Sequence, residues 1–166
     1  MSQATPFSFP RKQLCVGLFG YGVVGGAVFD VLCQKPNLHA AVKKICIKHP
    51  EKRRNIPAHF FTSHKEDVLD DPEINVVIEV IDDAEASFEI VRESLLRGKA
   101  VISANKKMIA QHFEELVDLQ LRCRTPLLYE AACCASLPII RNLEEYYDNE
   151  LLEGIEGIIN GSTNFI

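Results

Sequence analysis

The sequence has no long apolar run, no excess of basic residues and no closely spaced cysteine pair of the Cys-x-x-Cys type. None of its apolar stretches reaches the length of about 18 residues that a membrane-spanning helix needs, and residues 1–10 lack the charged and apolar regions of a signal peptide. The formal net charge is −5, whereas a nucleic-acid-binding face is usually basic. These absences predict a cytoplasmic protein that binds neither membranes nor nucleic acid.

The six cysteines show no metal-binding spacing, and no histidine lies at zinc-finger distance from them. Cys15 and Cys46 lie inside apolar, strand-like runs, where a thiol behaves as a small hydrophobic side chain. We therefore expect buried free thiols, with a disulfide or metal role as the alternative.

Short apolar runs alternate with longer amphipathic runs along the chain. We expect strands at 14–19, 40–48, 76–81, 100–103, 126–129 and 155–160, and helices at 23–33, 84–96, 105–122 and 138–147. This alternation predicts an α/β fold of the Rossmann type, a doubly wound parallel sheet with helices on both faces. The 166 residues fit one domain, which we place at 13–160 after a flexible arm at 1–12.

A glycine-rich turn, Gly20-x-Gly22-x-x-Gly25, joins the first predicted strand to the first predicted helix. Gly20 permits a tight turn, Gly22 lets a pyrophosphate approach the backbone, and Gly25 lets the helix pack closely on the strand. The N–H groups at the start of the helix would then face the phosphates. The other candidate cofactor contacts of this loop are Tyr21, Val23 and Val24. We interpret the loop as a site for NAD or NADP, with a ligand-free tight turn as the alternative.

A basic run, Lys48-His49-Pro50-Glu51-Lys52-Arg53-Arg54, follows the second predicted strand. An acidic side chain at this strand end would bind the ribose 2′-hydroxyl of NAD, but none is present there. Lys48 and Arg54 would instead favour the 2′-phosphate of NADP through charge-assisted hydrogen bonds. We predict that NADP binds at least as readily as NAD, with a solvated basic loop as the alternative.

Three further motifs follow in order: Ser103-Ala104-Asn105-Lys106, Tyr129-Glu130-Ala131-Ala132 and Asn160-Gly161-Ser162-Thr163-Asn164-Phe165. Together with the glycine loop, they resemble homoserine dehydrogenase over nearly the whole chain. That family interconverts homoserine and aspartate semialdehyde with NAD(P), in amino-acid biosynthesis from aspartate towards threonine and methionine. The resemblance implies the NAD(P)-binding domain of such an oxidoreductase.

The family also has a catalytic and dimerisation domain of the α+β class, which carries the substrate carboxylates and one catalytic lysine. The resemblance implies that this chain covers only the first domain, that residues 161–166 begin the connection to the second, and that the intact protein is a homodimer. We expect the chain alone to bind cofactor with little or no turnover. Two alternatives stay open: a stand-alone dinucleotide-binding regulatory module, and another dehydrogenase that acts on a semialdehyde or an amino acid.

The resemblance assigns Lys106 as the catalytic residue, beside the nicotinamide and the substrate oxygen. A lysine there would accept the alcohol proton or stabilise the developing alkoxide, whereas a pair of solvated lysines, Lys106 and Lys107, is the alternative. Asn105 fits the cap of the helix that carries Lys106, because its side chain can accept a backbone N–H. The remaining implied cofactor contacts are Ile81, Asp82 and Ser103.

The resemblance further implies a monovalent cation, Na⁺ or K⁺, bound by the backbone carbonyls of Glu130, Cys133, Ala135 and Leu137. A polar loop without an ion is the alternative. Two segments depart from the family's pattern: Asp82-Asp83 stands where the family usually has two glycines, and Cys133-Cys134-Ala135-Ser136 stands where it has a small, glycine-rich segment. Aspartates facing the nicotinamide ribose would bind its hydroxyls and repel phosphate, which predicts altered contacts there.

Overall fold

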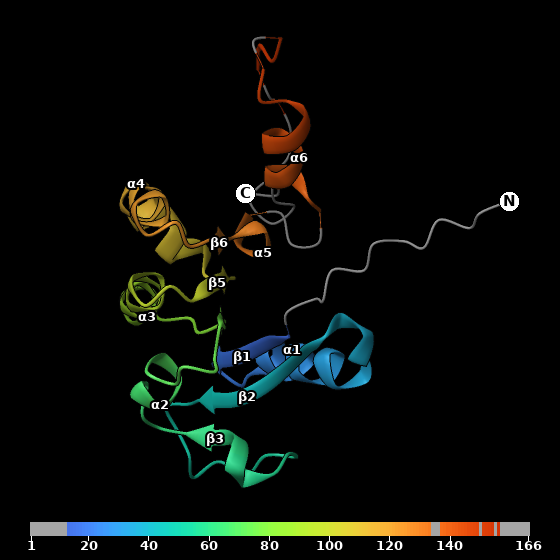
Figure 1. Ribbon diagram of the computed structural model, residues 1–166, viewed down its shortest axis with the longest axis vertical. Coiled ribbons are helices and arrows are strands. Elements are labelled where there is room, and N and C mark those ends of the chain that lie inside the picture. The colour runs from blue at the N-terminus through green and yellow to red at the C-terminus, as the bar shows by residue number, and fades with distance from the viewer. Residues whose placement is uncertain (1–12, 134–136, 150, 155, 157–166) are drawn as a thin grey trace, which may run out of the picture.

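The computed structural model describes residues 13–133, 137–149, 151–154 and 156, which form one sheet between layers of helices (Figure 1). The strands are β1 (Leu14–Phe19), β2 (Ala40–Cys46), β3 (Phe61–Thr62), β4 (Val76–Glu79), β5 (Ala100–Ser103) and β6 (Leu127–Leu128). The helices are α1 (Val23–Gln34), α2 (Glu66–Leu69), α3 (Ala84–Leu96), α4 (Lys106–Cys123), α5 (Glu130–Cys133) and α6 (Ile139–Tyr146). Two 3-10 turns cover Pro36–Leu38 and Ala58–Phe60.

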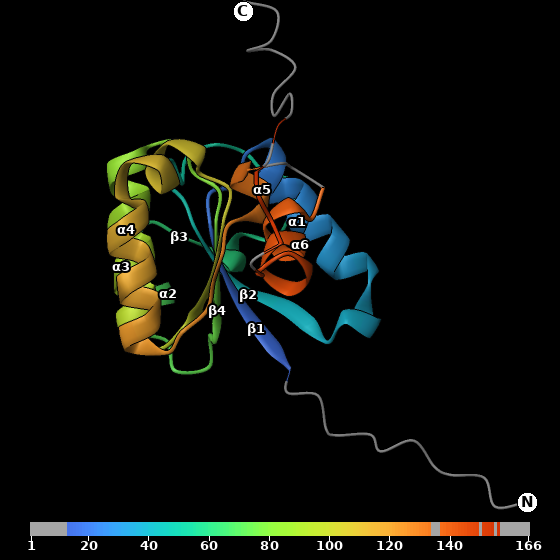
Figure 2. The ribbon, with the colours of Figure 1, turned by 90° about the horizontal axis from the view of Figure 1, so that it is seen from above.

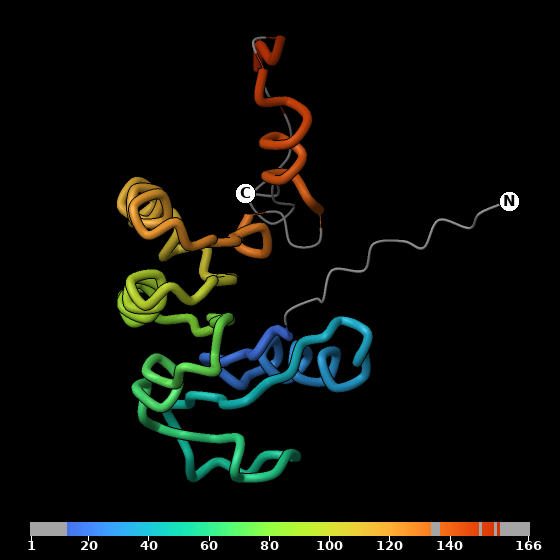
Figure 3. Tube along the Cα trace, viewed as in Figure 1, coloured from blue at the N-terminus to red at the C-terminus, as the bar shows by residue number. Residues whose placement is uncertain are grey.

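The strand order is β3-β2-β1-β4-β5-β6, and each neighbouring pair is parallel. The chain runs outward from β1 through β2 to β3, then returns to the other side of β1 and continues to β6, as the colours of Figure 3 show. Doubly wound sheets bind ligands where the strand order reverses, which is beside β1 here. The predicted doubly wound parallel sheet is confirmed.

Helices cover both faces of the sheet, with α3 and α4 on one side and α1 on the other (Figure 2). β4 is buried along its whole length, and its side chains alternate between the two layers. Val77 packs with Val91 of α3 in one core, whereas Val76 and Ile78 pack with Phe29 of α1 in the other. This burial explains why the central strands are apolar almost throughout.

The observed elements differ from the predicted ones mainly in short segments. β2 ends at Cys46 and β4 at Glu79, each before the predicted end. For β4 the reason is local, because the N–H of Ile81 donates to the side chain of Glu79 and not to a neighbouring strand. The elements β3, α2 and α5 and the 3-10 turns were not predicted, since so few residues carry no readable periodicity.

Some predictions fall on residues that the structure does not describe. These are the flexible arm at 1–12, the connection at 161–166, and the last strand at 155–160 except Glu156. Among the described residues, no helix combines the length and the apolar character that a membrane crossing requires.

Candidate functional site

Four strands end in one row across the sheet. In the register, Phe19 of β1 is paired with Cys46 of β2 and with Glu79 of β4, and Glu79 is paired with Ser103 of β5. Because the strands are parallel, the loops that follow them lie at the same edge of the sheet. This carboxyl edge gathers the segments that the sequence singled out: 20–25, 48–54, 81–83 and 103–106.

The glycine loop makes two close backbone approaches. Gly20 has φ of +98°, and its N–H donates to the carbonyl of Cys46 at 3.0 Å. A Cβ at Gly25 would lie 2.2 Å from the carbonyl oxygen of Gly20, so any side chain there would force helix α1 away from the strand end. A Cβ at Gly22 would meet nothing within 4 Å, which leaves open space in front of the loop.

Helix α1 begins with unfilled donors. Gly22 is its N-cap residue, and no described side chain caps the helix. Val23 is 93% exposed and Val24 53% exposed, so the first turn faces solvent. The free N–H groups and the positive end of the helix dipole make this turn suited to an anion.

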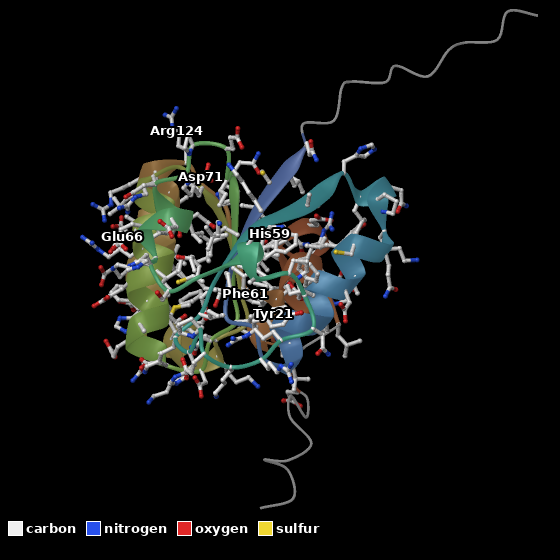
Figure 4. The ribbon with its side chains drawn as sticks, turned by 90° about the horizontal axis from the view of Figure 1, so that it is seen from below. Tyr21, His59, Phe61, Glu66, Asp71 and Arg124 are labelled. Atoms are coloured by element: carbon white, nitrogen blue, oxygen red, sulfur yellow. The ribbon has the colours of Figure 1, made fainter. Side chains whose placement is uncertain are left out.

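Aromatic packing fixes the loop beside the basic run. The ring of Tyr21 meets the ring of Phe61 edge-on, with 5.2 Å between the ring centres (Figure 4). It also lies edge-on to Phe29 at 6.1 Å. Burial raises the pKa of the Tyr21 hydroxyl. The guanidinium of Arg54 lies 5.0 Å from the centre of the Phe61 ring. Phe61 thus joins the glycine loop to the basic loop.

The basic loop holds Arg54 in place. Its guanidinium donates to the carbonyl oxygens of Lys52 at 2.7 Å and of His49 at 2.8 Å. Glu51, the carboxylate inside this run, pairs with Nδ1 of His49 at 3.1 Å. Lys48 is exposed at the end of β2. The loop therefore presents net positive charge towards the strand ends.

Two adjoining cavities occupy the carboxyl edge. The first, of 380 Å³, is lined by residues that include Gly20, Gly22, Lys48, Arg54, Ile81 and Asp82. The second, of 430 Å³, has a more apolar lining that includes Phe19, Cys46, Ile47, Ala86 and Ile90. Five residues line both cavities: Cys46, Ile47, Lys48, Ile81 and Asp82. The glycine loop, the basic loop and the loop after β4 therefore face one shared space.

The start of α4 lies at the same edge, but outside these two cavities. Lys106 and Lys107 are both exposed, and Lys107 lines a third cavity of 380 Å³ together with Lys48 and Asp82. Asn105 is buried and caps α4, because its Oδ1 accepts the N–H of Met108 at 2.9 Å. The predicted cap is thus present, and it fixes where Lys106 leaves the backbone.

A buried carboxyl, Glu79, stands at the centre of this edge and escaped the sequence reasoning. It has no exposed surface, and burial raises its pKa while a hydrogen bond from Ser103 opposes that rise. Ser103 Oγ donates to Glu79 Oε2 at 2.6 Å, and Ser103 is itself buried. The contact of Ser103 with the cofactor stays a prediction. The only signal in the sequence was one charged residue inside an apolar strand.

The two aspartates after β4 have different surroundings. Asp83 caps α3, because its Oδ1 accepts the N–H of Ala86 at 3.1 Å. Asp82 is exposed and lines all three cavities. Asp83 lines the second and third cavities as well, so Asp82 and Asp83 add one helix cap and two carboxylates at the carboxyl edge.

The predicted cation site is only partly described. Glu130 opens α5, and its carboxylate accepts the N–H groups of Ile140 at 3.0 Å and Arg141 at 3.2 Å at the start of α6. Cys133 is half-buried, Leu137 is exposed, and Ala135 lies outside the described residues. In the described ranges, no group of three or more His, Cys, Asp or Glu side chains is arranged to bind a metal. The carbonyl site stays a prediction.

Sequence comparisons identify relatives over most of the chain. Residues 20–130 match the family model for the homoserine dehydrogenase NAD binding domain. The homoserine dehydrogenase of Bacillus subtilis (strain 168) is 34% identical over 164 residues, which cover 93% of this chain and 38% of that protein. The homoserine dehydrogenase of Helicobacter pylori is 31% identical over 163 residues, which cover 94% of this chain and 38% of that protein.

Solved structures agree. A homoserine dehydrogenase from Thiobacillus denitrificans superimposes with a TM-score of 0.73 at 30% identity, over 81% of this chain and 33% of that one. A hyperthermophilic archaeal homoserine dehydrogenase in complex with NADPH gives 0.68 at 22% identity over 80% of this chain, which shows the shared fold alone. The chain spans about 38% of the length of the two curated relatives. It belongs to the homoserine dehydrogenase family and corresponds to that family's NAD-binding domain.

Proposed function

We propose that this chain binds NADP(H) at its carboxyl edge, as the cofactor half of a homoserine dehydrogenase. The observation that carries the proposal is the 380 Å³ cavity shared by the glycine loop and the basic loop. The space in front of Gly22, at the start of α1, is open, and the positively charged side chains of Lys48 and Arg54 line the same cavity. These features fit the two anionic parts of NADP, its pyrophosphate and its 2′-phosphate.

The pyrophosphate fits the first turn of α1, because the space before Gly22 is open and the N–H groups behind it lack a cap. The adenine fits the adjoining 430 Å³ cavity, whose lining is largely apolar. Lys48 lines both cavities and would therefore lie at the junction of adenine and ribose.

The 2′-phosphate fits the basic loop. The two carbonyls that bind Arg54 leave further guanidinium N–H donors for a phosphate. Glu51 is paired with His49, so it would not compete for Arg54. The exposed carboxylate of Asp82 suits the hydroxyls of the other ribose. We infer a preference for NADP over NAD.

Bound NADP⁺ would supply the acceptor for the hydride that leaves the alcohol carbon of homoserine when it becomes an aldehyde. We assign the alcohol proton, or the charge left on its oxygen, to Lys106 in the first turn of α4. Asn105 fixes the start of α4 and so directs Lys106. The remaining substrate contacts we assign to the part of the intact protein outside the matched region.

The cofactor preference is tested by titrating the chain with NADPH and NADH and following nicotinamide fluorescence. We expect tighter binding of NADPH, and we expect Arg54→Ala to weaken NADPH about tenfold or more with little effect on NADH. Arg122→Ala is the matched control, because Arg122 is an exposed arginine on α4 with its own ion pair to Asp118. Equal affinity for both cofactors, or tighter NADH, would overturn the preference.

We also test whether the chain, which we expect to bind the cofactor, lacks the remaining substrate contacts. The same preparation is assayed for homoserine oxidation. We expect NADPH binding without measurable turnover from the 166-residue chain. Steady turnover with homoserine would contradict the assignment of the substrate contacts to the rest of the intact protein.

A further inference from the structure

Glu79 is the one residue of β4 whose side chain brings charge into the sheet. It follows Val77 on the same face, where α3 and α4 cover the strands, and it has no exposed surface. No charged group contributes to the shift of its pKa: burial raises the pKa, and the hydrogen bonds from Ser103 and from the Ile81 backbone lower it. A carboxyl buried without a cation is unfavourable unless its hydrogen bonds are filled.

The hydrogen bonds of Glu79 form part of a closed ring across β4 and β5. The N–H of Ile81 donates to Glu79 Oε1 at 2.7 Å, and Ser103 Oγ donates to Glu79 Oε2 at 2.6 Å. Ser103 Oγ accepts the N–H of Asn105 at 3.1 Å. Asn105 Nδ2 donates to the carbonyl of Ile81 at 3.2 Å, which closes the ring.

The ring joins two segments that the proposed cofactor site uses. Ile81 begins the loop that lines both cavities, and Asn105 caps the helix that carries Lys106. The register of β4 with β5 ends at Glu79 and Ser103, and the N–H of Ala104 still donates to the carbonyl of Glu79 at 3.1 Å. Beyond that bond, the hydrogen bonds described between Ile81 and Asn105 come from side chains. A single carboxyl reaches both segments because its two oxygens accept one donor from each.

We propose that Glu79 is a positioning residue, which locks the loop after β4 to the start of α4 and so holds the cofactor-facing edge in its binding shape. This inference rests on the proposed cofactor function. Glu79 would not touch the cofactor itself, since it is covered completely.

The chemistry of the ring separates this role from simple packing. In Glu79→Gln, the amide oxygen can still accept the N–H of Ile81 while the amide nitrogen donates to Ser103 Oγ, so the ring closes again. In Glu79→Leu, the volume is nearly kept, but the N–H of Ile81 and the hydroxyl of Ser103 lose their partner. Val77→Ala is the matched control, because it removes buried side chain from the same face of the same strand and leaves the ring intact.

The experiment measures NADPH affinity and urea unfolding for the four proteins, together with amide hydrogen exchange. We expect Glu79→Leu to weaken NADPH about tenfold. Glu79→Gln should stay within about threefold of the wild type, and Val77→Ala should lose stability without losing affinity. The amides of Ile81 and Asn105 should exchange faster in Glu79→Leu relative to the core amides, and not in Glu79→Gln.

The outcomes separate a positioning role for Glu79 from an effect on stability alone. Wild-type affinity in a folded Glu79→Leu would overturn the positioning role. So would equal losses of affinity in Glu79→Leu and Val77→Ala, because the effect would then follow stability alone. If the wild-type chain binds neither NADPH nor NADH, the proposed function fails, and the exchange of Ile81 and Asn105 still shows whether Glu79 locks the two segments. Should Glu79→Leu not fold, Ser103→Ala opens the ring at its other side and replaces it in every measurement.

Discussion

The two edges of the sheet differ in how completely their polar groups are paired within the chain. At the amino edge, where β4 and β5 begin, the buried ammonium of Lys99 donates to the carbonyls of Asp71 at 2.6 Å and Ile74 at 2.7 Å. Lys43 of β2 pairs there with Asp71 and Glu73. Figure 4 shows Asp71 far from Tyr21, which marks the carboxyl edge. At the carboxyl edge, no side chain in the described part of the chain caps the start of α1, and Lys48 and Asp82 are exposed around a cavity. The amino edge therefore pairs its polar groups within the chain, whereas the carboxyl edge combines the paired groups around Glu79 with open donors that are suited to a ligand.

The largest expected effect on the carboxyl edge comes from a substitution at Gly25. A Cβ there would overlap the carbonyl of Gly20, so Gly25→Ala should cost about 1–3 kcal/mol of unfolding free energy and abolish NADPH binding. Gly26→Ala is the neighbouring control: its Cβ meets nothing within 4 Å, and the helix should gain about 0.5–1 kcal/mol. Urea unfolding and NADPH titration measure both variants. Normal affinity in Gly25→Ala would show that the close approach of α1 to Gly20 is dispensable.

At the amino edge, the same loss of stability should leave affinity untouched. Lys99 is 6% exposed, and Lys99→Met would leave the carbonyls of Asp71 and Ile74 without their donor. We expect a loss of about 2 kcal/mol in unfolding free energy, because buried unpaired acceptors are costly. The dissociation constant for NADPH, measured well below the unfolding midpoint, should not change. A parallel loss of affinity would show that the two edges are not independent.

A smaller effect is expected in the pH dependence of the unfolding free energy, through Glu79 at the carboxyl edge. Burial raises the pKa of Glu79 in the folded chain above its ordinary value of 4.5. At a pH between 4.5 and this raised pKa, the unfolded chain has lost a proton that the folded chain keeps. The stabilisation from the neutral acid is therefore complete below pH 4.5 and declines as the pH rises through the raised value. Glu79→Gln does not titrate at this position. The difference in unfolding free energy between wild type and Glu79→Gln should fall across that window, and a constant difference would contradict the shift.

The central fold could be read from the sequence because its signals are local. The apolar run before Gly20 and the glycine spacing predicted a strand, a turn and a helix, and each is present. The basic run predicted positive charge at the end of β2, and Lys48 and Arg54 line the cavity there. Spacing along the chain was enough for these features because each depends on neighbouring residues.

The rest depends on register and on contacts between distant residues. Glu79 and Ser103 are 24 residues apart, and only the pairing of β4 with β5 makes them neighbours. The position of Phe61 between Tyr21 and Arg54 likewise requires β3, which is too short to predict. Cytoplasmic location, the homodimer and the carbonyl-bound cation stay predictions from the sequence.

The contacts of Arg54 have a thermodynamic consequence. Two carbonyls and the face of Phe61 already restrain the guanidinium. An arginine side chain that is ordered during folding loses little further rotational freedom when a phosphate arrives. For the cofactor that we propose, affinity at this corner would then come with a small entropic penalty. Phe61→Leu, which removes the ring but keeps the charge, should make NADPH binding less favourable in entropy while the salt dependence of binding stays the same, and calorimetry at two ionic strengths separates these effects.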